Sequence, residues 1–141
     1  MISVYIDGAS RGNPGDAGIG IIAKEGSKTI FELAEYIGKS TNNVAEYMAL
    51  IRALEEILII GKKEAHFVSD SELLVRQVNG QYRVKDETLK VLHSQAGKLI
   101  NKFTKFSIEH KRREKNKKAD GLANKGIDSR FNNPDPLFSS K

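Results

Sequence analysis

The spacing of apolar residues changes along the first sixty residues, and this change is the strongest constraint on the fold. Residues 2–7, 18–26 and 28–38 read as strands joined by short connections. Three consecutive strands with short links favour an antiparallel meander. Between residues 40 and 61 the apolar residues instead recur every three or four positions, which predicts a long helix.

The rest of the chain continues to switch between these two patterns. Further elements are predicted in this order: strand 64–70, helix 71–80, helix 86–103, strand 103–110 and helix 116–129. The order β-β-β-α-β-α-α-β-α predicts an α/β domain, a five-stranded mixed sheet flanked by helices, with the first three strands antiparallel. We expect this domain to cover residues 1–128 and an irregular tail to follow at 129–141, a segment that holds two of the three prolines.

Composition narrows the class of protein. A length of 141 residues suits one hydrophobic core, and no apolar run is long enough to cross a membrane. The absence of cysteine excludes disulfides, thiolate metal sites and a cysteine nucleophile, and it fits a cytoplasmic protein. The net charge of +5 favours an anionic partner, nucleic acid before a membrane surface.

Four acidic residues occupy positions where core-facing apolar residues would be expected. Asp7 and Asp70 each end a predicted strand, and Glu46 and Asp120 each lie on the apolar stripe of a predicted helix. Each acid has an ordinary explanation when it is considered alone. An acid at a strand end often caps a turn or a helix, and an acid at the edge of a helical stripe can reach water.

The four acids have a joint explanation if the fold brings them together. Clustered carboxylates repel one another unless a cation lies among them. Mg²⁺ and Mn²⁺ prefer oxygen ligands and would suit such a cluster. Four carboxylates can hold two ions about 3.5–4 Å apart, an arrangement suited to phosphodiester hydrolysis. Periodicity alone does not show that the four acids meet.

The chain resembles the ribonuclease H type 1 family in four motifs that follow the family's order: YIDGASRGNPGDAGIG (5–20), STNNVAEYMAL (40–50), FVSDSELLVRQVNG (67–80) and REKNKKADGLAN (113–124). The resemblance runs from residue 2 to about residue 127. It implies a ribonuclease H-like fold and an endonuclease that hydrolyses the RNA strand of RNA–DNA hybrids with two divalent ions. The products would carry 3′-hydroxyl and 5′-phosphate ends, and we expect the protein to act as a monomer.

The resemblance also assigns roles to the four acids. Asp7, Glu46, Asp70 and Asp120 match the family's metal-binding residues. By this match Asp7 bridges two Mg²⁺ ions, for which Mn²⁺ can substitute. Glu46 and Asp70 complete one metal site, and Asp120 completes the other. The attacking water would lie on the ion held by Asp7 and Asp120.

Substrate contacts are implied at the glycine-rich segment and at the start of the long helix. Asn13, Asn42 and Asn43 match minor-groove contacts, where short amides reach sugar hydroxyls and base edges, and only RNA offers a 2′-hydroxyl. Thr41 matches a position that binds a phosphate of the DNA strand. Asn42 and Asn43 would also suit helix capping, and the two roles are compatible.

The chain departs from many family members in two places. It has no tryptophan, and the segment NGQYRVKDETL (79–89) runs straight on where longer members carry a basic protrusion, so it resembles the shorter subgroup. His110 lies ten positions before Asp120, where many members have a mobile catalytic histidine, but the loop HKRREKNKK contains no glycine. His110 therefore either assists catalysis or is only a strand-end residue.

The run of residues 111–118 holds six basic residues and one acid. Such a run is either a solvated loop or, beside a site that binds nucleic acid, a source of phosphate contacts through Lys115, Lys117 and Lys118.

Two rival functions remain at this point. A non-catalytic nucleic-acid-binding module with the same fold should have lost at least one metal acid, and this chain has all four. A related nuclease could act on DNA or double-stranded RNA. The asparagines argue against an enzyme restricted to DNA and leave double-stranded RNA open.

Overall fold

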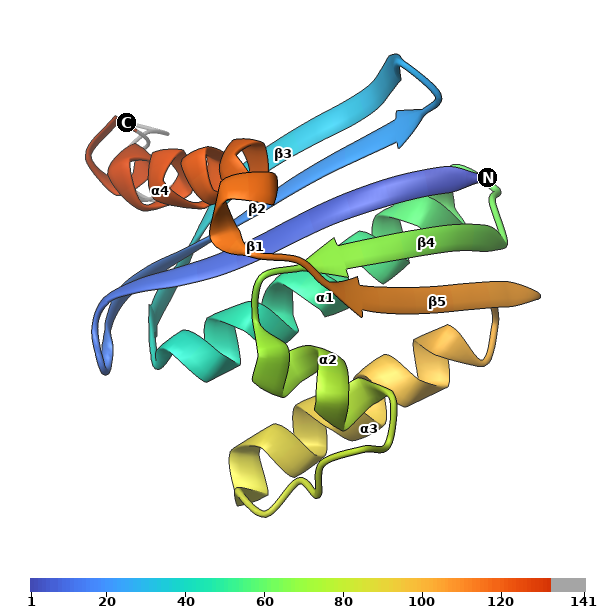
Figure 1. Ribbon diagram of the computed structural model, residues 1–141. Helices are drawn as coiled ribbons and strands as arrows, with labels where there is room; N and C mark the ends of the chain where they lie inside the picture. The colour runs from blue at the N-terminus through green and yellow to red at the C-terminus, as the bar shows by residue number, and fades with distance from the viewer. Residues whose placement is uncertain (133–141) are drawn as a thin grey trace.

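Strand β1 (Ile2–Gly12) forms the centre of a five-stranded sheet in the computed structural model, which describes residues 1–132 (Figure 1). The strand order is β3-β2-β1-β4-β5. β2 (Gly15–Glu25) and β3 (Lys28–Ser40) form the antiparallel half, and β4 (Glu64–Ser69) and β5 (Lys105–His110) run parallel to β1. The predicted mixed sheet is therefore confirmed.

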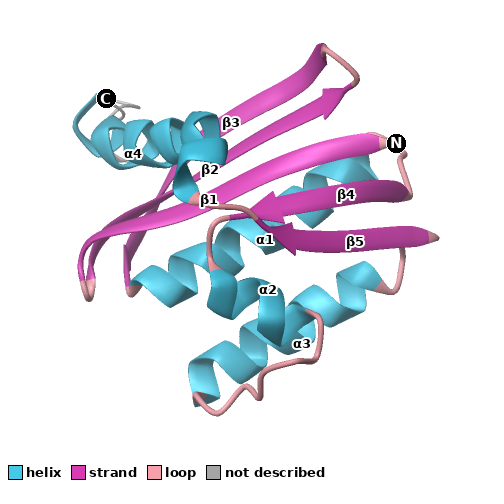
Figure 2. Ribbon diagram, in the orientation of Figure 1, coloured by secondary structure: helices cyan, strands magenta, loops and turns pink. Residues whose placement is uncertain are grey.

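Helices cover both faces of the sheet (Figure 2). α1 (Asn42–Ile59), α2 (Glu72–Val78) and α3 (Glu87–Ile100) lie on one face. α4 (Lys117–Asn132) packs on the other face against β1, β2 and β3, and a short 3-10 turn, η1 (Arg113–Lys115), leads into it.

α4 extends further than the sequence predicted, because residues 129–132 are helical where the irregular tail was expected to begin. Polar side chains satisfy carbonyl groups in its last turns. Ser129 donates to the Gly126 carbonyl at 2.6 Å, and Arg130 donates to the Ile127 carbonyl at 3.0 Å. Arg130 also pairs with Asp16 of β2 at 3.2 Å. The remainder of the predicted tail, residues 133–141, lies outside the described residues.

The core lies between the sheet and α1. Ile2, Val4 and Ile6 of β1 are buried, and so is the α1 stripe that carries Glu46. Thr41 caps the start of α1, with its hydroxyl accepting from the Val44 N–H at 3.2 Å, so neither Asn42 nor Asn43 is the N-cap residue. The same burial that drives α1 onto the sheet therefore carries Glu46 inward.

β1 does not end at Asp7, which corrects the prediction of a strand at 2–7 followed by a loop. It stays paired with β2 as far as Gly12 opposite Gly15. Its parallel pairing with β4 stops earlier, at Ile6 opposite Ser69. The antiparallel neighbour supplies hydrogen bonds that keep the glycine-rich segment extended. Asp7 thus lies at the first position of β1 after its pairing with β4 ends.

Two glycines let helices approach β1 and β2 closely. A Cβ atom at Gly8 would lie 2.2 Å from the carbonyl carbon of Ala45, the residue before Glu46. A Cβ atom at Gly20, the strand partner of Asp7, would lie 2.2 Å from the carbonyl oxygen of Ala119, the residue before Asp120. These distances leave no room for a side chain, so both glycines are required for the observed packing.

We expect Gly20→Ala to destabilise the protein by roughly 1–3 kcal/mol, the usual cost of overpacking a tight interior contact. Gly97→Ala in α3 is the matched control, because a Cβ atom there meets nothing within 4 Å. The control should be neutral or more stable, since alanine favours a helix by about 0.5–1 kcal/mol over glycine. Urea denaturation measures both variants. Equal stabilities would mean that α4 can shift away from β2 at no cost.

Candidate metal and nucleic-acid site

Three acids from distant parts of the chain meet at Asp7. One carboxylate oxygen each from Asp7, Glu46 and Asp70 lies within 4.8 Å of the others. They come from β1, α1 and the residue after β4. Asp120 of α4 lies outside this group of three, but its side chain is close enough to Asp7 to help raise the pKa of Asp7. The structure thus gathers all four predicted acids around one strand position.

Local contacts orient these acids toward one another. The Gly8 N–H donates to Glu46 Oε1 at 2.7 Å, so the residue after Asp7 holds the α1 carboxylate in place. Asp70 does not cap α2, because Ser71 fills that role and accepts from the Leu74 N–H at 3.1 Å. The capping explanation for Asp70 is therefore wrong, and its carboxylate faces the cluster.

The acids are strongly perturbed by burial and by one another. Burial raises the pKa of Asp7 to about 10, and the charges of Glu46 and Asp70 act in the same direction. Burial and Asp70 raise the pKa of Glu46 to about 8, against the opposing effect of the Gly8 N–H. Burial also raises the pKa of Asp70. The cluster is therefore short of positive charge.

Arg113 is the basic residue paired with this cluster, and sequence analysis did not single it out within the run 111–118. Its Nε lies 3.9 Å from Asp70 Oδ2, and its side chain is 77% exposed. Its charge lowers the pKa of both Glu46 and Asp70, without overcoming the effect of burial. An exposed guanidinium at this distance offsets only part of the repulsion.

The donor set fits a divalent metal ion. Asp70 Oδ2 is buried and has no hydrogen-bond partner among the described residues, an arrangement that costs stability unless a cation completes it. The ligands are carboxylate oxygens without nitrogen or sulfur, a set that Mg²⁺, Mn²⁺ and Ca²⁺ prefer. An acidic cluster able to bind a divalent metal is therefore present.

The predicted substrate contacts lie together at the start of α1. Asn13, Thr41 and Asn43 line a groove of about 540 Å³, beside Lys39. Asn13, in the turn between β1 and β2, accepts from the Asn42 N–H at 3.2 Å. Asn13, Asn42 and Asn43 are exposed, so their remaining polar atoms are available to a ligand.

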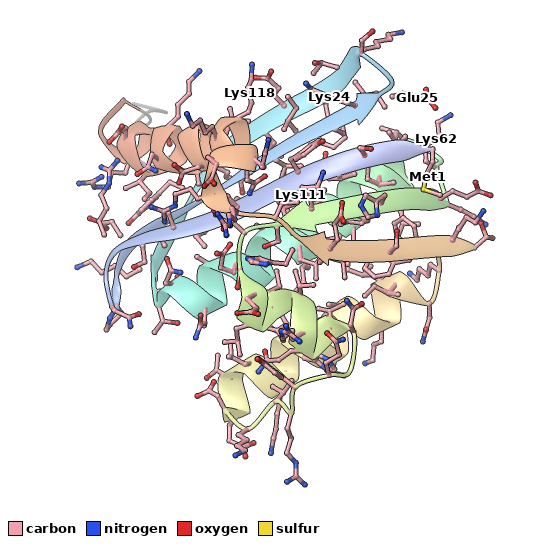
Figure 3. All side chains as sticks on the ribbon, in the orientation of Figure 1. Met1, Lys24, Glu25, Lys62, Lys111 and Lys118 are labelled. Atoms are coloured by element: carbon pink, nitrogen blue, oxygen red, sulfur yellow. The ribbon has the colours of Figure 1, made fainter. Side chains whose placement is uncertain are left out.

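Residues 111–118, named here the basic segment, connect β5 to α4, and Figure 3 labels Lys111 and Lys118 near its two ends. Lys111 pairs with Glu109 at 3.6 Å, and Lys118 pairs with Glu32 at 3.2 Å. Within residues 1–132, Lys115 and Lys117 have no ion pair. The segment therefore borders the acids and keeps free positive charge.

His110 is exposed and is the last residue of β5, as its strand-end interpretation requires. It lies opposite Ser69 in the parallel register, next to Asp70, and a positive charge on it would lower the pKa of Asp70. Its position therefore remains compatible with either role predicted from the sequence.

Known protein families and sequences include relatives of this chain. A family model described as reverse transcriptase-like matches residues 5–126. A bifunctional protein of Mycobacterium tuberculosis is 39% identical over 130 residues, which cover 91% of this chain and 36% of that protein. The chain thus spans about a third of the length of this relative.

Two solved structures are similar over nearly the whole chain. Ribonuclease H1 from Halobacterium salinarum has a TM-score of 0.88 at 39% identity, covering 91% of this chain and 98% of that chain. LC11-RNase H1, isolated from compost and solved in complex with an RNA/DNA hybrid, has a TM-score of 0.88 at 43% identity, covering 93% and 99%.

The sheet order, the cluster of Asp7, Glu46 and Asp70, and the similar solved structures define the ribonuclease H-like class of α/β proteins. The chain belongs to the ribonuclease H type 1 family, and its match to short relatives confirms the predicted subgroup without a basic protrusion. Among the described residues, no helix has the length and apolarity needed to cross a membrane.

The raised pKa values predict how stability depends on pH in chelator. Between about pH 4 and pH 8 the unfolded chain has released protons that Asp7 and Glu46 retain when folded. The folded state then binds more protons, so the free energy of unfolding should fall as pH rises through this window. Asp7→Asn should flatten the decline and be at least as stable as wild type at pH 8, measured by urea denaturation.

Asp128→Asn is the control for this measurement. Arg11 lies 2.6 Å from the exposed Asp128 and holds its pKa below the usual value, so this substitution removes an attraction instead of a repulsion. It should not flatten the decline. A less stable Asp7→Asn protein in chelator would contradict the electrostatic account and indicate a structural role for the Asp7 carboxylate.

Proposed function

We propose that the protein is a metal-dependent endonuclease that hydrolyses the RNA strand of RNA–DNA hybrids and leaves 3′-hydroxyl and 5′-phosphate ends. The observation that carries the proposal is the convergence of Asp7, Glu46 and Asp70 within 4.8 Å, in a fold of this family. The hybrid bound by the similar LC11-RNase H1 supports the choice of substrate. A non-catalytic module would have no need to retain four mutually repelling acids.

The proposed cofactor is a pair of Mg²⁺ ions, with Mn²⁺ as a substitute. Asp7 has Glu46 and Asp70 within 4.8 Å and also neighbours Asp120, so it is placed to be shared between two sites. When bound, such ions supply an activated water and stabilise the leaving oxygen. The protein holds the four carboxylates in position and buries them, which strengthens their interaction with positive charge.

Substrate recognition is assigned to the groove at the start of α1. The amides of Asn13, Asn42 and Asn43 are proposed to contact the minor groove, where the 2′-hydroxyl distinguishes RNA from DNA. Thr41 and the neighbouring Lys39 are proposed to hold a phosphate of the DNA strand, since both line the same groove. The two strands would then be recognised by adjoining parts of one surface.

The basic segment is proposed to replace the missing protrusion. Lys115 and Lys118 line a hollow of about 200 Å³ together with Lys24, which concentrates positive charge beside Asn116 and the start of α4. Lys117 lies between these two lysines in the sequence, and its side chain is exposed. His110 is proposed to assist at the edge of the acid cluster. The predicted monomeric state and cytoplasmic location are part of this proposal.

Incubation with end-labelled substrates tests the activity. We expect cleavage of the RNA in a hybrid with Mg²⁺ or Mn²⁺ and none with chelator, and slower or absent cleavage of duplex RNA, duplex DNA and single strands. Asp7→Asn should abolish cleavage, because the shared ligand loses its charge and keeps its shape. Asp128→Asn, an exposed acid of α4, should retain wild-type cleavage. Robust cleavage by Asp7→Asn would overturn the metal assignment.

The salt dependence of hybrid binding tests the basic segment. Replacing Lys115, Lys117 and Lys118 together by alanine should flatten the slope of log K against log salt by roughly two to three, at about 0.9 per phosphate contact on a B-form duplex. Hybrids of different sequence should respond alike, since phosphates carry no base information.

A matched control replaces Lys62, Lys63 and Lys105. These exposed lysines lie just before β4 or at the first residue of β5, whereas the basic segment follows the last residue of β5. It removes the same charge and should leave the slope nearly unchanged. If both triple variants behave alike, the basic segment is a solvated loop and the hybrid is held elsewhere.

A further inference from the structure

Asn116 is a buried polar residue that none of the predicted roles includes. It lies between η1 and α4 and is 2% exposed. Its side-chain amide donates to the Ile6 carbonyl at 2.8 Å, across 110 positions of sequence. Its own backbone carbonyl accepts from the Asp120 N–H at 3.0 Å. A single residue therefore bonds to the strand position before Asp7 and to Asp120 itself.

The location of this contact on β1 matters for the site. Ile6 is the last residue of β1 that pairs with β4, and Asp7 follows directly. The start of α4 is thus attached to β1 where the parallel half of the sheet ends. Displacement of this attachment would move Asp120 relative to Asp7 before it disturbed any other acid.

The packing of α4 on β2 does not replace this hydrogen bond. The carbonyl of Ala119 lies against Gly20, and that contact limits how closely the helix approaches the sheet. A steric contact of this kind sets how closely the helix approaches the strand. The directional bond from Asn116 to Ile6 adds a specific attachment at the residue before Asp7.

Stability alone is a poor explanation for an amide at this position. Asn116 Oδ1 is buried and has no hydrogen-bond partner among the described residues. An unpaired buried acceptor is costly, and this cost offsets part of the stability that the bond to Ile6 provides. A role in placing the acids requires only the side-chain N–H of Asn116. This role therefore explains why the N–H is bonded while the side-chain oxygen is unpaired.

We infer that Asn116 is a positioning residue that sets Asp120 against Asp7 and so defines the metal site that these two acids share. The inference rests on the proposed function of the acid cluster. It predicts that loss of the Asn116 amide weakens the response to metal more than it weakens the fold.

The test compares Asn116→Leu, and the smaller Asn116→Ser, with Asn79→Leu. Asn79 is a control for the type of bond, because its side chain donates to the Ile108 carbonyl at 3.3 Å, although it is more exposed. For each protein the Mg²⁺ and Mn²⁺ concentrations for half-maximal hybrid cleavage are measured. The metal-induced rise in melting temperature, relative to chelator, is measured without substrate.

Both Asn116 variants should need about tenfold more metal in both measurements, and their residual cleavage should recover at high Mn²⁺ concentration. Asn79→Leu should keep the wild-type metal response, whatever stability it loses in chelator. A wild-type metal response in either folded Asn116 variant overturns the inference, as does an equal shift in Asn79→Leu.

The two proposals fail in different ways. If wild type binds metal but cuts no hybrid, the proposed function is wrong, and the melting measurement still decides the role of Asn116. If wild type cuts hybrid and the Asn116 variants keep its metal dependence, only the role of Asn116 is wrong. A wild-type protein that neither cuts nor responds to metal contradicts both.

Discussion

The close approach of two helices to the central strands is the constraint on which the site depends. α1 reaches β1 over Gly8, and α4 reaches β2 over Gly20. In both cases the helical residue in contact directly precedes an acid of the cluster. The side chains that converge on Asp7 are therefore placed by backbone contacts, which are stiffer than contacts between long side chains.

Repulsion between the buried carboxylates opposes the packing that brings them together. Burial on both faces of the sheet brings carboxylates together at low exposure, and the pKa values of Asp7 and Glu46 rise as a result. Arg113 supplies partial compensation from the solvent side. The fold thus accepts a local instability at the point where a cation would relieve it, a pattern typical of sites organised for chemistry.

Sequence predicted the parts of the site that depend on local pattern. Glu46 could be placed on a buried stripe because helical periodicity is a property of neighbouring residues, and Asp70 could be placed at a strand end for a similar reason. The length of the β1–β2 hairpin was missed, because glycine-rich segments have low strand propensity and become extended only through their partner strand.

Asn116 shows why the remaining features could not be predicted. A polar residue among lysines reads as exposed, and its burial depends on Ile6, which is 110 positions away. The ion pair of Arg113 with Asp70 is likewise a product of tertiary structure, since the run 111–118 gives no sign of which cation pairs with the acids.

The order of elements along the chain has a consequence for how the site is completed during synthesis. α4 follows all five strands, so the whole sheet and three of the acids are available before the helix that carries Asp120 can dock. Domains begin to fold from the N-terminal side as the chain emerges. A nascent chain can therefore hold a nearly complete fold and lack a complete site, and competence for chemistry appears only when the last helix closes onto the sheet.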